Sequence, residues 1–279
     1  MIKAIFFDID GTLVSKNEKI LASTKRGIAQ AQAKGIICGI ATGRGPVHLK
    51  QQTDELNLDV FVTYNGQLAY TNEEVFWAEA FSKEVLTKIV SFSDQYHRQI
   101  IFGSNEEIAG SSLMRFGQMK GAKKLVRFLP RRFPMMFIKN TVSRFSFHRK
   151  EQRYHDLDIL TKPIYQCVLL SPESEFNWLQ EQLPVCRFTR SNPYTVDIIP
   201  AKGSKLLGIE KFVERFDLTL DQVMVFGDSW NDLEMLDGAG IGVAMGNAEA
   251  EVKAAADFVT KTNDEDGIYY ALKHYGIVE

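Results

Sequence analysis

Asp8 is the last residue of the run IKAIFFD at residues 2–8, where a strand is expected to end, and a second aspartate, Asp10, follows two residues later. A carboxylate at a strand end can attack as a nucleophile, and a second one two residues later can exchange a proton with the attacking or leaving oxygen. Gly11 permits the sharp turn that aims successive backbone N–H groups at an anion. The alternative is a turn in which the aspartates serve only as turn formers or a helix cap.

A further carboxylate, Asp228, follows the apolar run VMVFG in GDSWND at residues 227–232, and Asn231 and Asp232 open the helix expected after it. If Asp8 and Asp228 share one edge of a sheet, their charges repel, and a bound hard cation removes that cost. An all-oxygen ligand set with few protein ligands suits Mg²⁺ best. The alternative is a helix N-cap in which these side chains accept hydrogen bonds from free backbone N–H groups.

A hydroxyl and a lysine could complete a phosphate site. Thr42 ends a strand-like run in ATGR, where Gly43 allows close backbone approach, and Lys202 stands in PAKGSK before a helical pattern. Lys205, three residues later, competes for the same role. A lysine supplies fixed positive charge where phosphate oxygens gather. Taken singly, the threonine also fits a strand-end cap and the lysine a solvated surface charge.

The elements expected to position these residues alternate between short apolar runs and helical patterns. Runs that are apolar on consecutive positions indicate strands covered on both faces, and right-handed crossovers bring their carboxyl ends to one edge. That edge would carry Asp8, Thr42, Asn65 and Asp228. The expected strands are residues 2–8, 36–42, 60–65, 223–228, 241–246 and 257–260, and the expected helices 23–34, 46–56, 203–215, 230–236, 248–255 and 265–275.

The alternation breaks at about residue 83, where an amphipathic helix, several strand-like pieces and a second helix follow. This stretch, residues 83–198, predicts an inserted α+β domain, and residues 1–82 and 199–279 predict one core. The fold class is therefore α/β, with a doubly wound parallel-sheet core and an inserted α+β domain.

The ordered set DIDGTL, ATGR, KG and GDSWNDLEML resembles the motifs of the haloacid dehalogenase-like superfamily, phosphatase branch. NGQLAY, IGVAMGNA and DFVTKTNDEDGI resemble its Cof-like group, in which a substrate cap is inserted between the second and third motifs. The resemblance covers nearly all of the core, which it identifies as Rossmann-like, and implies that residues 83–198 are the substrate-specificity cap.

The resemblance implies a role for each motif residue. Asp8 would be the nucleophile that forms an aspartyl-phosphate, and Asp10 the general acid/base. Mg²⁺ would bind Asp8, Asp228 and the backbone carbonyl of Asp10. The phosphate would contact Ile9, Thr42, Gly43, Lys202 and Asn231, with Gly11 and Asp232 supporting the site.

The function expected from these roles is a magnesium-dependent phosphatase acting on a small phosphorylated metabolite, a sugar phosphate or a cofactor phosphate. A phosphomutase would share the aspartyl-phosphate, and the inserted cap and Cof-like tail favour hydrolysis over it. A receiver domain also uses an Asp at a parallel strand end, but it is about half this length. A non-catalytic regulator that binds a phosphorylated metabolite is the remaining alternative.

The composition of the chain limits the classes of binding partner that are expected. Lys+Arg 33 against Asp+Glu 35 gives no global reason to expect nucleic acid, and no run has the length of a membrane span. The first strand starts at the N-terminus without a leader, and the three cysteines Cys38, Cys167 and Cys186 suit a reducing compartment, so a cytoplasmic monomer or homodimer is expected. Residues 115–153 hold twelve basic residues and one acid, Glu151. This stretch could steer anionic substrates, through Arg131 and Arg132 among others, or simply form a solvated face.

Overall fold

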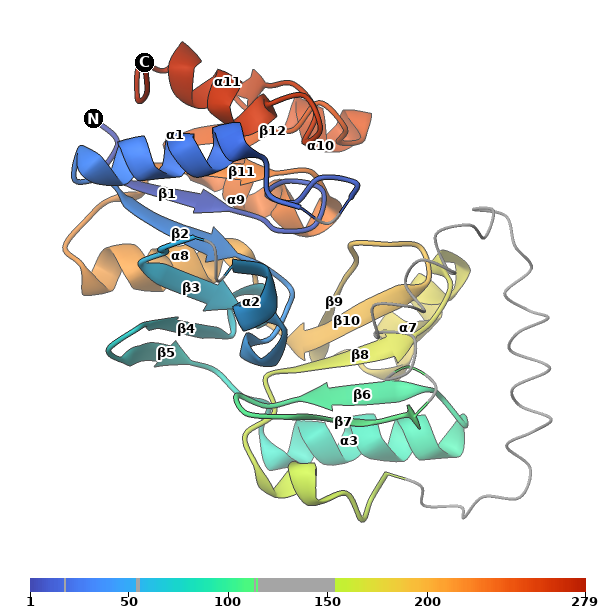
Figure 1. Cartoon of the computed structure of the whole chain (residues 1–279). Helices are drawn as coiled ribbons and strands as arrows, with labels where there is room; N and C mark the ends of the chain where they lie inside the picture. Colours follow the sequence, from blue (N-terminus) through green and yellow to red (C-terminus); the bar gives the residue numbers. More distant parts are fainter. Residues whose placement is uncertain (18, 54–55, 113, 115–153) are drawn as a thin grey trace. The chain divides into compact units, whose positions relative to one another are not determined.

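The computed structural model describes the chain except for residues 18, 54–55, 113 and 115–153 (Figure 1). The described residues form two compact units: Met1–Glu79 with Lys202–Glu279, and Ala80–Ala201. The second unit is therefore inserted between two halves of the first. The basic stretch expected to steer substrates, residues 115–153, lies outside the described residues.

The first unit is built on a sheet whose described strands run in the order β13-β12-β11-β1-β2-β3-β4-β5. The strands from β13 to β3 are parallel, and β4 and β5 add an antiparallel hairpin at one edge. The strands are β1 (Ala4–Phe7), β2 (Ile37–Ala41), β3 (Val60–Thr63), β4 (Leu68–Thr71), β5 (Val75–Ala78), β11 (Val223–Gly227), β12 (Ile241–Ala244) and β13 (Phe258–Val259).

Helices cover both faces of this sheet (Figure 1). Successive residues of β1 enter different cores: Ile5 and Phe7 pack on the side of α1 and α11, and Phe6 packs on the side of α8 and α9. This two-sided burial explains why the strands are apolar at consecutive positions, and it confirms the doubly wound α/β core. The helices are α1 (Ala22–Ala33), α2 (Pro46–Thr53), α8 (Lys205–Arg215), α9 (Leu233–Gly238), α10 (Ala250–Ala254) and α11 (Gly267–His274).

The second unit has a separate antiparallel sheet, with described strands in the order β7-β6-β8-β10-β9. Two helices, α3 (Lys83–Gln95) and α7 (Phe176–Gln182), share one apolar core with it, to which Ile89, Phe102 and Leu179 contribute. The inserted segment is thus α+β, as predicted. Its strands are β6 (Ile100–Gly103), β7 (Ile108–Gly110), β8 (Gln166–Leu170), β9 (Cys186–Thr189) and β10 (Thr195–Pro200).

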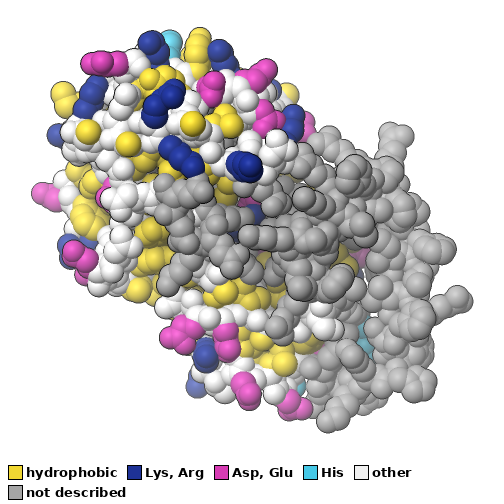
Figure 2. All heavy atoms as spheres, viewed as in Figure 1, with side chains coloured by type: hydrophobic (Ala, Val, Ile, Leu, Met, Phe, Trp, Pro, Cys, Tyr) yellow, Lys and Arg dark blue, Asp and Glu magenta, His cyan; other side chains and the backbone are white. Residues whose placement is uncertain are grey.

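The surface of the described residues is mixed in charge. On the face that Figure 2 shows, acidic and basic side chains of these residues are interspersed. Within the described part of the chain, no helix combines the length and apolar character needed to span a membrane.

Candidate active site

Asp8 lies immediately after β1, a central strand of the first unit, and its side chain is buried. Its backbone N–H continues the ladder to β11 by donating to the carbonyl of Phe226 at 2.9 Å. The chain then turns back on itself: Leu13 donates to the carbonyl of Asp8 at 3.1 Å, and Val14 donates to that of Ile9 at 3.0 Å. The backbone after the strand is therefore fixed around the Asp8 carboxylate.

Gly11 is required in this turn for two reasons. Its φ of +89° lies in the left-handed region, and a Cβ built there would lie 2.2 Å from Asp228 Oδ2. Thr12, the next residue, donates from its hydroxyl to Asp228 Oδ1 at 3.1 Å. The loop after β1 therefore packs directly on the carboxylate that follows β11.

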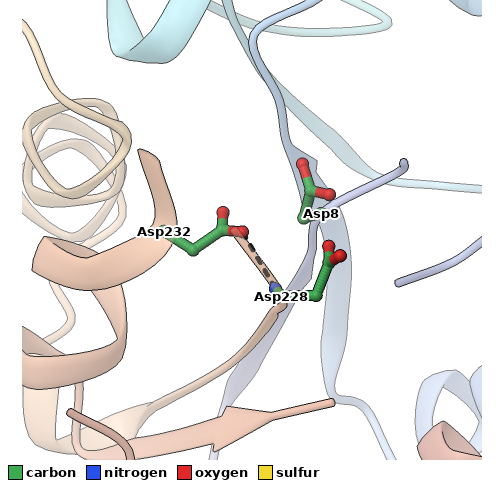
Figure 3. Close-up of side chains that lie close together, drawn as sticks. All are labelled: Asp8, Asp228 and Asp232. Carbon is green, nitrogen blue, oxygen red and sulfur yellow. Dashed lines mark hydrogen bonds between the residues drawn. The ribbon is translucent and has the colours of Figure 1, made fainter. Parts of the chain in front are cut away.

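Three carboxylates gather at this edge of the sheet. Asp8, Asp228 and Asp232 each offer an oxygen, and these atoms lie within 4.8 Å of one another. Figure 3 shows the carboxylates of Asp8 and Asp228 close together after neighbouring strands, with Asp232 approaching from the segment that follows Asp228. Asp232 is already engaged: its Oδ2 accepts the backbone N–H groups of Asp228 at 3.0 Å and Ser229 at 2.9 Å.

The lysine of the site is Lys205. Its buried Nζ donates to Asp8 Oδ1 at 2.5 Å and to Asp232 Oδ1 at 2.6 Å. The structure does not support the expectation for Lys202, which is exposed in the turn before α8. Ser204 caps α8 by accepting from Leu207 N at 3.0 Å, so the helix begins at Lys205.

The start of α8 is held close to the sheet edge by a second turn. Residues Tyr64, Asn65 and Gly66 all have positive φ, and a Cβ on Gly66 would lie 1.8 Å from the carbonyl oxygen of Ser204. This contact presses the turn after β3 onto the first residues of α8. Lys205 is consequently fixed next to Asp8 rather than free in solvent.

Asp10 does not join the carboxylate cluster through its side chain. Arg44 forms a bidentate ion pair with it: Nε donates to Asp10 Oδ2 and Nη2 donates to Asp10 Oδ1, each at 2.5 Å. Arg44 in turn donates its backbone N–H to Thr42 Oγ1 at 3.2 Å, at the end of β2. Arg44 is the last residue of the ATGR motif, and the motif alone predicts no role for it.

Thr42, Gly43 and Asn231 complete the placement of the predicted residues. Thr42 is buried after β2, next to β1, and Gly43 follows it half-buried. Thr42 accepts at its carbonyl from the backbone N–H of Asn65 at 3.0 Å. Asn231 donates from Nδ2 to Asn65 Oδ1 at 3.0 Å. Asn65 was expected at this edge but given no function, and the structure shows that it links two motifs.

Burial dominates the electrostatics of the cluster. It raises the pKa of Asp8 well above its ordinary value, against the opposing attraction of Lys205. Burial and the charge of Asp232 raise the pKa of Asp228 to about 7. Burial lowers the pKa of Lys205, but the negative charges of Asp232 and Asp8 raise it by more, so the pKa lies above its ordinary value.

The donor set fits a hard divalent cation. The carboxylates of Asp8 and Asp228 supply only oxygens, and one lysine does not balance the crowded negative charge around them. A dication placed between such carboxylates would favour their charged forms. The carboxylates of Asp8 and Asp228 are therefore suited to Mg²⁺.

Comparison with known proteins now assigns the family. A family model described as haloacid dehalogenase-like hydrolase matches residues 5–272. The chain belongs to this family. YkrA of Bacillus subtilis (strain 168) is 31% identical over 277 residues, 99% of each chain.

Two further relatives of this hydrolase carry informative names. The 5-amino-6-(5-phospho-D-ribitylamino)uracil phosphatase YcsE of Bacillus subtilis (strain 168) is 26% identical, with 98% of this chain and 96% of YcsE covered. The solved structure of the HAD subclass IIB sugar phosphatase BT4131 superposes with a TM-score of 0.79 and 31% identity, covering 99% of this chain and 100% of that one. The family resemblance expected from the motifs is thus confirmed.

Proposed function

We propose that this hydrolase is a magnesium-dependent phosphatase that cleaves a phosphate monoester of a small metabolite, such as a sugar phosphate or a cofactor phosphate. The observation that carries the proposal is the buried Asp8 at the end of β1, with Lys205 Nζ at 2.5 Å and the Asp228 carboxylate in the same cluster. A carboxylate nucleophile beside fixed positive charge is what attack on a phosphate dianion requires.

The proposed reaction has two steps. In the first, an Asp8 oxygen bonds to phosphorus, the bond from phosphorus to the ester oxygen breaks, and Asp10, which has taken up a proton from solvent before this step, transfers that proton to the leaving oxygen. In the second, water attacks phosphorus, Asp10 takes its proton, and the bond between Asp8 and phosphorus breaks to release phosphate. Bound Mg²⁺ would neutralise negative charge on the phosphoryl oxygens.

Other residues of the chain bind and orient the phosphoryl group. Lys205 holds its ammonium group beside Asp8, where it can attract an equatorial oxygen of the transferring group. Thr42, Asn231 and the backbone after Asp8 are assigned hydrogen bonds to the remaining oxygens.

Asp10 has to be released before it can transfer a proton. Its two carboxylate oxygens are paired with Arg44, which holds the carboxylate in one orientation. Substrate binding therefore has to compete with Arg44 for Asp10, or Arg44 has to turn toward the substrate.

The substrate class is proposed from the relatives. BT4131 is named as a sugar phosphatase, and YcsE as a phosphatase of a phosphorylated ribitylaminouracil. Both descriptions concern small phosphorylated molecules with a polyhydroxylated chain or ring. We assign recognition of the leaving group to the inserted unit, Ala80–Ala201, as in the proposed cap role.

The test is a panel of phosphate monoesters incubated with purified full-length protein and Mg²⁺, with release of inorganic phosphate as the readout. Asp8→Asn should abolish turnover and leave the circular dichroism spectrum unchanged, because the amide is nearly isosteric but a poor nucleophile. Acid quenching of the wild type should yield a peptide containing Asp8 that carries one phosphoryl group. Substantial turnover by Asp8→Asn would falsify the aspartyl-phosphate mechanism.

A further inference from the structure

Asn247, to which the motifs assign no role, contacts the carboxylate cluster directly. It lies in the loop between β12 and α10, and its Nδ2 donates to the carbonyl of Gly11 at 2.9 Å and to Asp228 Oδ2 at 3.3 Å. One carboxamide therefore touches both the loop after Asp8 and the carboxylate after β11.

The orientation of Asn247 is itself fixed by the loop before α11. Asn247 Oδ1 accepts the backbone N–H of Asn263 at 3.0 Å, which leaves Nδ2 directed at Gly11 and Asp228. The buried side chain of Asn263 donates in turn to the carbonyl of Val14 at 2.7 Å. Asn247 and Asn263 thus form a continuous hydrogen-bonded connection across the loop that follows the nucleophile.

Two further contacts join the same segments. The backbone N–H of Lys16 donates to Asp264 Oδ1 at 2.9 Å, and Ser23 Oγ donates to Asp266 Oδ1 at 2.5 Å. The loop before α11 is therefore attached at several points to residues 14–23. This attachment gives Asn263 a fixed position from which to hold Asn247.

With the contact from Asn247, both oxygens of the Asp228 carboxylate accept a hydrogen bond from an uncharged side chain. Thr12 donates to Oδ1 and Asn247 to Oδ2, so each oxygen has one donor from the protein and the plane of the carboxylate is defined. Each carboxylate oxygen retains a further acceptor position for a cation. Side chains that orient a metal ligand in this way typically contribute about 10- to 100-fold to metal affinity.

We infer that Asn247 is a positioning residue for the metal centre, which it serves by orienting Asp228 and the Gly11 peptide. The inference rests on the proposed function, because it takes Asp228 as a ligand of Mg²⁺. Asn247 is exposed, so its replacement should change the stability of the metal-free protein little. The main effect of Asn247 is therefore on the affinity of the site for Mg²⁺.

The experiment measures Mg²⁺ affinity of the full chain without substrate, by calorimetry and by the rise of the melting temperature with Mg²⁺. Asn247→Ala should weaken Mg²⁺ binding by about 10- to 100-fold and leave the melting temperature in chelator nearly unchanged. In any substrate assay, its kcat should return to the wild-type value at high Mg²⁺. Asn72→Ala, an exposed asparagine in the turn between β4 and β5, is the matched control and should bind Mg²⁺ as the wild type does.

A second variant separates positioning from stability. Asn263→Ala removes the side-chain bond to Val14 but keeps the backbone N–H that Asn247 accepts. It should lower the melting temperature, because a buried carbonyl loses its donor, and should affect Mg²⁺ affinity less than Asn247→Ala does.

The outcomes distinguish this inference from the proposed function. Equal Mg²⁺ affinity in Asn247→Ala and wild type overturns the inference alone. The inference would also be overturned if, in Asn247→Ala and Asn263→Ala, the loss of Mg²⁺ affinity were proportional to the loss of melting temperature. Absence of Mg²⁺ binding by the wild type would instead contradict the proposed metal requirement, with Asp228→Asn as the variant expected to reproduce that loss.

Discussion

Replacing Lys205 by methionine should strongly destabilise the protein. The ammonium group is inaccessible to solvent and is the basic partner of both Asp8 and Asp232, at 2.5 and 2.6 Å. Lys205→Met keeps the aliphatic volume but leaves two buried carboxylates without their shared cation. Removing one partner of a buried ion pair costs about 3–5 kcal/mol.

That cost can be converted into a melting temperature. A change of 1 kcal/mol shifts the midpoint of a domain of this size by roughly 2–4 °C, so Lys205→Met should lower the transition of the core by about 6–20 °C. The assay is thermal unfolding followed by circular dichroism, with chelator present so that no cation replaces the lysine. Lys211→Met on the same helix is the control, since Lys211 pairs with Glu214 at the surface and should matter by less than about 1 kcal/mol.

The pH dependence of this difference follows from the raised pKa of Asp8, whose main cause is burial. A carboxyl with a raised pKa in the folded state destabilises that state as pH rises through the folded pKa, and the penalty disappears on acidification. Without Lys205 the penalty is larger, so the gap between Lys205→Met and wild type should narrow as pH falls. Asp8→Asn should be as stable as the wild type or more stable.

Two results would refute this reasoning. A melting temperature for Lys205→Met within about 2 °C of the wild type, roughly 1 kcal/mol or less, would show that the carboxylates do not need the lysine as their counter-ion. The second is a difference in melting temperature between Lys205→Met and wild type that widens as the pH falls. Buried carboxylates that take up protons would make this difference narrower. The double variant Lys205→Met with Asp8→Asn should recover part of the lost stability, since only Asp232 then remains unpaired.

Three further outcomes are expected. Gly11→Ala should abolish Mg²⁺ binding measured by calorimetry, because its Cβ would lie 2.2 Å from Asp228 Oδ2; Gly35→Ala, also at positive φ but with no atom within 4 Å of its Cβ, should retain it. Since burial raises the pKa of Asp228 to about 7 and also raises that of Asp8, Mg²⁺ must displace protons at low pH, and its affinity should fall between pH 7 and 5 by up to about tenfold per pH unit for each proton displaced; a flat profile contradicts this. Chelator should stop phosphate release, and Mg²⁺ but not Ca²⁺ should restore it, because Ca²⁺ adopts longer and more variable coordination; full activity with Ca²⁺ would count against the proposed role of the ion.

The parallel strands could be predicted from the sequence because strands that are buried on both faces have apolar residues at consecutive positions, as in β1 and β11. The hairpin of β4 and β5 could not, because β4 is buried only at its first two residues, the edge strand β5 is partly exposed throughout, and neither shows that pattern. Local hydrogen bonding also shifted where one helix begins. The sequence predicts a single helix over 230–236, but a turn of 3-10 helix at Trp230–Asp232 precedes α9, which begins at Leu233.

The choice between Lys202 and Lys205 shows where spacing alone fails. Lys202 precedes the helix and Lys205 opens it; the cap at Ser204 fixes that start, and the turn at Gly66 holds it close to the sheet edge. Sequence could have favoured Lys205, because Ser is a strong N-cap residue and the apolar pattern of α8 begins just after it. The pairing of Arg44 with Asp10 depends on the positions of two loops, which no local pattern records.

The pairing of β1 with β11 has a consequence for how the protein is made. Ala4 is aligned with Val223, so the strand that carries the nucleophile borders a strand from the far end of the chain. At about 5–20 residues per second, the intervening chain takes on the order of ten to forty seconds to emerge from a ribosome. During that interval β1 to β5 can pair with one another, but the edge of β1 that β11 will cover stays open, and such long-range pairing is slow and exposed to aggregation. The inserted unit, Ala80–Ala201, emerges as a continuous segment before β11 is made, so the nascent chain completes a second folded body before it can complete the first.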